Sequence, residues 1–263
     1  MFLDWLDPLL TRVPRAVRAM GYLREINGIH KRYERCREAW AEHVAQSRSV
    51  IRRAVERCTQ RRKAVILGAG LLHDVPLEEL AATFREVILV DLVHPFQSRW
   101  ATRHLPNVRR LAADVTGTVE QVYQLAWEAH LPLPRSRPQL FCDDPEVDFT
   151  ASMNLLSQLP CVPLTYLTQE GAHASEKIAL FARHLIEAHL DYLARQPGVV
   201  ALVTDVERLK ITLAHQVVER RDLLLGVLLP KAGDEWEWRL APCPEADPRH
   251  HYYRRVVGIA DYK

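Results

Sequence analysis

One stretch of the sequence, residues 63–95, constrains the fold more than any other. The apolar run Ala64-Val65-Ile66-Leu67 leads into Gly68-Ala69-Gly70, and a second apolar run, residues 87–90, ends on Asp91. Glycines let the backbone approach a ligand closely, and a carboxylate at the tip of the second strand can accept hydrogen bonds from two ribose hydroxyls. The stretch therefore predicts half of a nucleotide-binding α/β unit.

From residue 63 onward, short apolar runs alternate with amphipathic stretches. The apolar runs predict strands at 64–67, 86–91, 108–113, 147–151 and 199–205. The stretches between them predict helices from 74 or 75 to 84, and at 96–104, 119–130 and 173–195. Two β-like segments, 235–240 and 252–260, flank a loop that contains three prolines, which is typical of antiparallel strands. The pattern predicts an α/β fold: a doubly wound, mostly parallel seven-stranded sheet with an antiparallel C-terminal hairpin.

The first 62 residues predict a helical cap on this sheet. No Gly or Pro occurs from His30 to Arg62, and residues 1–27, with Pro8 and Pro14, are typical of one or two shorter helices. We therefore divide the chain into a helical cap, 1–62, and a Rossmann-like domain, 63–263. A stripe of residues spaced by three or four positions predicts the face on which the long helix packs. Its members are Tyr33, Cys36, Trp40, Val44, Ser47, Ile51, Ala54 and Cys58.

Charge is distributed unevenly along the chain. Residues 1–63 hold 15 Lys and Arg against 7 Asp and Glu, whereas the other 200 residues hold 20 against 26. Arg48, Arg52, Arg53 and Arg57 lie largely off the apolar stripe. They can form a solvated helix face, or a basic surface for nucleic acid or an acidic protein. A binding module on a degenerate enzyme fold is therefore an alternative function.

Composition also narrows the class of protein. No run of about 18 uncharged apolar residues occurs, so no membrane span is expected. Five scattered cysteines without a CxxC pair predict reduced thiols in a cytoplasmic protein. The twelve histidines lack the spacing of a metal site, so no metal is expected.

The glycine turn leaves two ligand classes open. A dinucleotide fold favours G-x-G-x-x-G, in which the third glycine allows close packing of helix on strand. Gly68 and Gly70 match the first two positions, but His73 stands at the third. This weakens the prediction of an NAD-binding Rossmann protein, which stays as an alternative.

Four motifs in order point to a family. They are residues 65–70, residues 88–91, the run Leu111-Ala112-Ala113-Asp114, and residues 148–159, which begin Asp-Phe-Thr-Ala-Ser-Met-Asn. In this order and spacing, residues 60–263 resemble the class I S-adenosylmethionine-dependent methyltransferases. That family ends its parallel sheet with an inserted antiparallel strand, which the terminal hairpin matches. The resemblance implies methyl transfer from S-adenosylmethionine to a small-molecule acceptor that the sequence does not identify.

The resemblance also implies roles for individual residues. Gly68, Ala69 and Gly70 would pass beneath the methionyl part and ribose of the cofactor, and Asp91 would hold the ribose hydroxyls. Asp114 would accept from the adenine amino group, although Asp before Thr-Gly also favours a turn. Leu71-Leu72-His73 stand where the family has a small residue, so His73 or Asp74 could supply a contact instead. The segment beside the sulfonium methyl would contain Ser152, Asn154 and Leu155.

Methyl transfer is a direct displacement, so the protein mainly aligns the acceptor and removes its proton where needed. The Asp/Asn-Pro-Pro-aromatic signature of nucleobase N-methylation is absent after the fourth predicted strand. Ligands bind at the carboxyl ends of strands in open α/β sheets. Position therefore favours Asp205, Glu207 and His94 as bases, with His173 at a helix start as a further option.

Overall fold

The computed structural model describes residues 13–125, 127–128, 130–171 and 173–263, so the helices predicted before residue 13 lie outside the described residues. The first half contains α2 (Arg15–Ala19), α3 (Tyr22–Arg35), α4 (Arg37–Glu56), β1 (Lys63–Leu67), α5 (Leu77–Thr83), β2 (Glu86–Asp91), α6 (Phe96–Thr102), β3 (Val108–Ala112) and α7 (Val119–Gln124). The second half contains β4 (Val147–Met153), the 3₁₀ turn η1 (Leu156–Gln158), α8 (Cys161–Glu170), α9 (Ser175–Arg195), β5 (Val199–Thr212), β6 (Val217–Asp222), β7 (Asp234–Ala241) and β8 (His250–Ile259).

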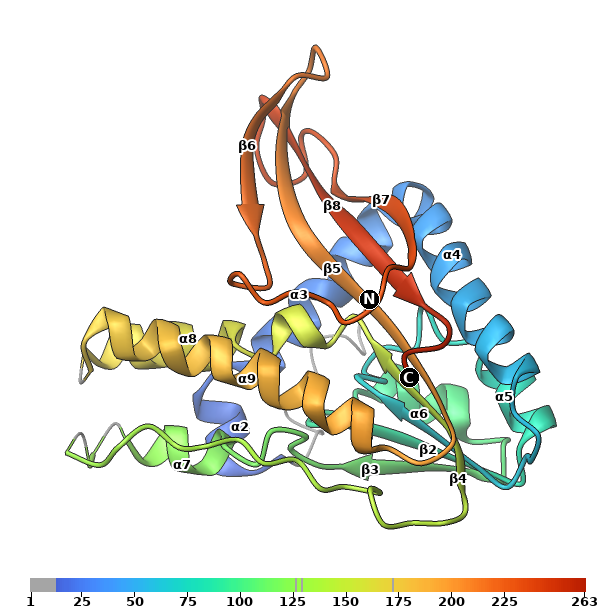
Figure 1. The fold of residues 1–263 in the computed structure, drawn as a ribbon. Helices are drawn as coiled ribbons and strands as arrows, with labels where there is room; N and C mark the ends of the chain where they lie inside the picture. Colours follow the sequence, from blue (N-terminus) through green and yellow to red (C-terminus); the bar gives the residue numbers. More distant parts are fainter. Residues whose placement is uncertain (1–12, 126, 129, 172) are drawn as a thin grey trace.

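The strands form one sheet in the order β3-β2-β1-β4-β5-β8-β7 (Figure 1). The first five are parallel neighbours, and β8 runs antiparallel between β5 and β7. The predicted seven-stranded, mostly parallel sheet with an antiparallel C-terminal pair is confirmed. The inserted position of β8 is the one that the resemblance implied.

An eighth strand, β6, was not predicted. It pairs with the far half of β5, which runs seven residues beyond the predicted end at Asp205. All six residues of β6 are exposed, so its sequence lacks the apolar alternation that marks a half-buried strand. Cross-strand ion pairs, Arg208 with Glu219 and Arg220 with Glu207, accompany the pairing. Together β5, β6 and β8 form an arm that projects beyond the helices (Figure 1).

Helices cover both faces of the sheet, with α4 and α5 on one side and α7 to α9 on the other (Figure 1). The alternation of side chains along β1 explains this arrangement. Ala64 and Ile66 belong to the core that contains α4 and α5, whereas Val65 and Leu67 belong to the core that contains α9. A strand buried on both faces is apolar along its buried length, as Ala64 to Leu67 of β1 are.

The predicted single helix from His30 to Arg62 is in fact two helices. The chain leaves helical geometry at Cys36, where φ is −110° and ψ is 21°, and α4 ends at Glu56. On α4 the predicted stripe is correct: Trp40, Ile51 and Ala54 are buried in the same core as β1 and β4. Because of this bend, α3 and α4 run in different directions, which one continuous helix could not do.

Two further helices are shorter than predicted. Asp74 does not cap α5, which begins after Pro76, because the Asp74 carboxylate contacts Asn154 instead. Likewise α7 ends at Gln124 rather than at residue 130. Residues 126 and 129 of that predicted helix lie outside the described part of the chain.

The N-terminal helices share their cores with the rest of the chain. Val17 of α2 and Leu23 of α3 pack in a third core with residues of α7, α8 and α9. Since α4 also lines the sheet, the predicted boundary at residue 62 does not separate two hydrophobic cores. Of the described helices, none is both long enough and apolar enough to cross a membrane.

Ion pairs within the molecule largely balance the uneven charge distribution. Arginines of the first 62 residues pair with carboxylates of the later, acidic part of the chain. The pairs are Arg35–Glu245, Arg52–Glu79, Arg53–Asp234, Arg57–Asp261 and Arg62–Asp148. Each exposed pair stabilises little by itself, but the pairs link the N-terminal segment to later parts of the chain.

The burial of α4 leads to a stability prediction. Ile51 is 0% exposed, and its replacement by Ala removes packing from the centre of the sheet face. We expect Ile51→Ala to lower the free energy of unfolding by about 2–5 kcal/mol, measured by urea denaturation. Leu180→Ala on α9 is the control, because Leu180 is 68% exposed and should change stability by less than about 0.5 kcal/mol. Equal effects of the two substitutions would show that α4 is not part of the core.

Candidate functional site

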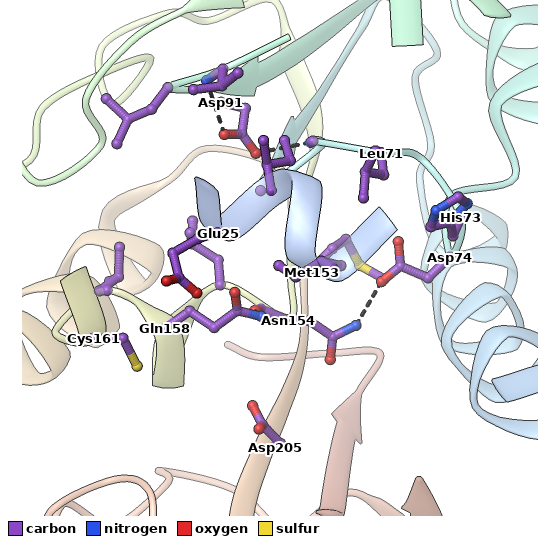
Figure 2. A pocket seen from close by; sticks show the side chains of 18 of the residues that line it. Glu25, Leu71, His73, Asp74, Asp91, Met153, Asn154, Gln158, Cys161 and Asp205 are labelled. Carbon is purple, nitrogen blue, oxygen red and sulfur yellow. Dashed lines mark hydrogen bonds between the residues drawn. The ribbon is translucent and has the colours of Figure 1, made fainter. Parts of the chain in front are cut away.

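A cavity of about 370 Å³ lies at the carboxyl ends of β1, β2, β4 and β5. α3 lies across it, and the segments that follow the strands form its walls (Figure 2). β1 pairs with β2 on one side and with β4 on the other, so the order of strands reverses here. Such a switch point is where open α/β sheets bind ligands, and the volume is that of a small-molecule pocket.

The glycine turn forms one wall of the cavity. Gly68 has φ of 76°, and a Cβ at this position would lie 2.7 Å from the carbonyl oxygen of Met153. The N–H groups of Gly68 and Ala69 both donate to the carbonyl of Val90, at 3.0 and 3.2 Å. These contacts hold the turn against the tips of β2 and β4. Gly68 and Gly70 line the cavity, whereas Ala69 is buried in the core.

Asp91 lies at the tip of β2 and faces the glycine turn (Figure 2). Its Oδ2 accepts the N–H of Gly70 at 2.8 Å, and its Oδ1 accepts the N–H of Val93 at 3.2 Å. Burial raises the pKa of Asp91, and the Gly70 N–H opposes that shift. A carboxylate has about four acceptor positions, so Asp91 keeps acceptor capacity for a ligand in the cavity.

Asp114 follows β3 and lines the same cavity. Its Oδ1 accepts from the N–H and the hydroxyl of Thr116, at 2.8 and 2.7 Å, and its Oδ2 accepts the N–H of Val119 at 2.8 Å. The carboxylate therefore holds the turn into α7, which was the alternative interpretation of this residue. Nearby, burial raises the pKa of the Tyr22 phenol, and the charge of Asp114 adds to the shift.

Asn154 follows β4 in left-handed geometry, with φ of 47°. Asn tolerates this region better than most residues. Its N–H donates to the carbonyl of Val203 at 2.8 Å. Its side-chain amide lies between half-buried Asp74 and buried His43: Nδ2 is 2.6 Å from Asp74 Oδ2 and 3.2 Å from His43 Nε2. Leu155, the next residue, also lines the cavity.

Asp205 lies at the opposite end of the cavity from Asp91 (Figure 2). It is 5% exposed, and its Oδ1 accepts a hydrogen bond from the hydroxyl of Ser157. Its Oδ2 lies 3.5 Å from Nε of Arg254. Burial lowers the pKa of Arg254, and the Asp205 charge opposes that shift. Cys161 and Glu25 also line the cavity and give it a polar, charged part.

Several predicted site residues do not line the cavity. The hydroxyl of Ser152 is fully buried and lies 2.9 Å from His189 Nε2. His94 donates from Nε2 to the carbonyl of Leu111 at 3.0 Å, and Glu207 pairs with Arg220 on the arm. His173 is also absent from the lining. Of the predicted bases, only Asp205 reaches the cavity.

Other lining residues were not predicted. Tyr22 and Ile26 come from α3, His43 from α4, and Trp238 from β7. His43 lies beside the apolar stripe and stacks on Trp238, with ring centroids 4.0 Å apart. No local spacing marks these residues, because the helices and β7 meet the cavity only through the tertiary packing.

No cluster of metal ligands occurs among the residues that the structure describes. No group of three or more His, Cys, Asp or Glu in this part of the chain could hold a metal ion. The five cysteines are free thiols, and Cys36 and Cys58 are buried.

Comparisons with known proteins find only low similarity. No protein-family model and no curated protein matches the sequence. Among solved structures, the chain is similar to the 1,6-didemethyltoxoflavin-N1-methyltransferase of Burkholderia thailandensis, with a TM-score of 0.37 and 15% identity over 95% of this chain and 92% of that one. The N-methyltransferase NodS of Bradyrhizobium japonicum gives a TM-score of 0.37 and 11% identity over 84% and 97%. The 23S rRNA methyltransferase ErmE gives 0.33 and 12% over 81% and 69%.

The order of the strands decides the fold. Five parallel strands are followed by an antiparallel strand inserted between the fifth and the last. The inserted antiparallel strand is the feature that the resemblance to class I S-adenosylmethionine-dependent methyltransferases implied. In this sheet the cavity, the glycine turn and Asp91 occupy one connected site at the carboxyl edge.

The close approach of the glycine turn to β4 leads to a second stability prediction. Gly68→Ala should be destabilising for two reasons: left-handed backbone costs an L-residue about 1–2 kcal/mol, and the added Cβ would meet Met153 O at 2.7 Å. Gly117→Ala is the matched control, because Gly117 has φ of 68° with no atom within 4 Å of an added Cβ. Thermal and urea unfolding should show a larger loss for Gly68→Ala. Equal losses would mean that the turn does not press on β4.

Proposed function

We propose that the protein is a methyltransferase that uses S-adenosylmethionine and acts on a small-molecule acceptor. The observation that carries the proposal is the position of Asp91, which lines the cavity beside Gly70 at the strand switch point. A carboxylate with free acceptor positions at this place suits the two ribose hydroxyls of a nucleoside. The inserted antiparallel strand β8 supports the choice of S-adenosylmethionine among nucleoside ligands.

A dinucleotide is less well suited to the glycine turn. Diphosphate binding depends on a helix that begins directly at the turn, so that its N-terminal N–H groups face the anion. Here α5 begins only at Leu77, and the intervening residues include the half-buried Asp74. The glycine turn therefore disfavours an NAD-binding protein.

The residues of the cavity fit the proposed cofactor. Gly68 and Gly70 leave the wall without side chains, and an added Cβ on Gly70 would lie 3.2 Å from Asp91 Oδ2. In this arrangement Asp91 would hold the ribose and Asp114 would lie on the adenine side. Asn154 and Leu155 would lie near the methionyl part. When bound, the cofactor supplies an activated methyl group on a sulfonium.

The other part of the cavity would receive the acceptor. α3 encloses the space, which supports a small molecule rather than a polymer. There the chain aligns the acceptor, and Asp205 is positioned to take the proton that the acceptor loses on methylation. Ser157 and Arg254 orient the Asp205 carboxylate by hydrogen bonding and charge.

We do not extend the proposal to nucleic acid. Of the four off-stripe arginines, Arg52, Arg53 and Arg57 pair with carboxylates of the same chain. Arg48 donates to the carbonyl of His73 at 2.8 Å. These contacts compete with phosphate for the same guanidinium groups.

Calorimetry tests the proposed cofactor directly. We expect the protein to bind S-adenosylmethionine and S-adenosylhomocysteine and not NAD. Asp91→Ala should weaken S-adenosylhomocysteine binding about 100-fold or more, because each hydrogen bond to a carboxylate contributes roughly 1.5–3 kcal/mol. Asp143→Ala, at an exposed position, is the control and should bind as the unchanged protein does.

Two results would contradict the proposal. One is binding of NAD without binding of either sulfur nucleoside. The other is an unchanged affinity of Asp91→Ala for S-adenosylhomocysteine. Thermal unfolding of each variant confirms that a loss of binding is not a loss of fold, since Asp91 also accepts the Gly70 N–H.

A further inference from the structure

Four side chains from distant parts of the chain meet at one wall of the cavity. His43 comes from α4, Asp74 from the segment after the glycine turn, Asn154 from the end of β4 and Trp236 from β7. The first three line the cavity, and His43, Asn154 and Trp236 are each less than a tenth exposed. Their hydrogen bonds form a chain in which each proton can be assigned.

The chain begins at Trp236, whose indole N–H lies 3.1 Å from Nδ1 of His43. An indole nitrogen only donates, so Nδ1 must be without a proton. A doubly protonated, cationic His43 is excluded for the same reason, and burial lowers the pKa of His43 to about 3. The neutral ring therefore carries its one proton on Nε2.

The proton on His43 Nε2 determines which atom of the Asn154 carboxamide faces it. Nε2–H needs an acceptor, and the atom 3.2 Å away belongs to the Asn154 carboxamide. Only the carbonyl oxygen of a carboxamide accepts, and its NH2 group and oxygen have nearly the same shape. The Asn154 oxygen must therefore occupy the position drawn as nitrogen in Figure 2, which is a 180° turn of the amide.

That oxygen also lies 2.6 Å from Oδ2 of Asp74. Two oxygens at hydrogen-bond distance need a proton between them, because an oxygen without a proton only accepts. Asn154 has no proton to give from its oxygen, so the proton must belong to Asp74. Burial raises the pKa of Asp74, in agreement with a neutral acid.

We propose that Asp74 is an uncharged carboxylic acid in the folded protein, and that Asp74 and His43 together orient the Asn154 amide with its NH2 group toward the cavity. The amide position opposite Asp74 is buried and has no hydrogen-bond partner among the described residues. In Figure 2 it points toward the side on which Asp205 lies. An NH2 group there donates to an oxygen of a bound ligand, whereas an oxygen there would select a ligand amino group.

This polarity gives Asp74 and His43 a positioning role in ligand selection. The protonation of this hydrogen-bond chain depends only on residues of the protein itself. The role of the hydrogen-bond chain in binding the cofactor or acceptor rests on the proposed function. The protonation state and its role in binding can therefore be disproved separately. Measurements on the ligand-free protein test the chain, and the calorimetry described above tests the cofactor.

The first experiment determines the tautomer of His43 by ¹⁵N NMR of the full chain near neutral pH. The expected result is the Nε2–H tautomer, with Nδ1 accepting from the Trp236 indole. The signal is assigned by its loss in His43→Gln and by the coupling of Nδ1 to the Trp236 N–H. The Nδ1–H tautomer would overturn the proposal, because Nε2 would then accept from an Asn154 NH2 group and Asp74 would be a carboxylate.

The second experiment compares unfolding of the unchanged protein and Asp74→Asn by urea between pH 4 and 7. Asn at this position is neutral and keeps an N–H donor toward Asn154. His43 from α4 and His73 from its own segment line the same cavity as Asp74. Of the charged groups near it, Arg48 from α4 favours the ionised form. Burial outweighs it, so the folded pKa of Asp74 is raised.

The sign of the expected pH dependence follows from proton binding. Above the unfolded pKa of about 4, the folded protein holds a proton that the unfolded chain has released, so the stability of the unchanged protein falls as pH rises. The fall ends at the folded pKa. Asp74→Asn lacks this loss of stability with rising pH. The ratio of its unfolding constant to that of the unchanged protein should therefore drop about tenfold per pH unit over that range.

Asp143→Asn is the control, because Asp143 is exposed and should show no such trend. A ratio of unfolding constants for Asp74→Asn that stays flat with pH, like the control, would overturn the proposal. This measurement does not depend on whether His43→Gln folds.

Discussion

The polar groups of the cavity lie together because β1, β2, β4 and β5 are parallel neighbours in one sheet. Parallel strands present all their carboxyl ends at one edge, so the residues that follow them converge. Gly68 and Gly70 follow β1, Asp91 ends β2, Asn154 follows β4, and Asp205 lies within β5 at the same edge. The close packing of Gly68 under Met153 keeps the first and fourth strands in this relation.

The second determinant of the site is the packing of α4 on the sheet. Its buried stripe places His43 against Trp236 and Trp238 of β7, and the bend at Cys36 then sends α3 across the cavity. The enclosure of the site therefore depends on helices that precede the sheet in sequence. Ion pairs between these helices and the later part of the chain, such as Arg35 with Glu245, reinforce the same arrangement.

Much of this structure could be predicted from local pattern. The strand 86–91 has the predicted bounds, and the antiparallel strand inserted into the sheet is the feature that the resemblance implied. The polar positions were harder to predict. Asp114 serves the turn into α7 as well as the cavity wall, and Ser152 points away from the cavity to His189. Adjacent residues of a strand face opposite sides of a sheet, so Ser152 faces away from the side on which its neighbour Met153 lines the cavity. Asn154 lies past the end of β4 in left-handed geometry, so strand alternation does not set its direction.

The sequence by itself determined the α/β class, the parallel core, the glycine turn and Asp91, because these depend on periodicity and on residues adjacent in the chain. Only the tertiary structure decided which groups complete the site. His43, Asp74, Asn154 and Trp236 lie far apart in sequence, and their protonation depends on one another. A hydrogen-bond chain of this kind has no local signature, since each proton is assigned by a partner that another element supplies.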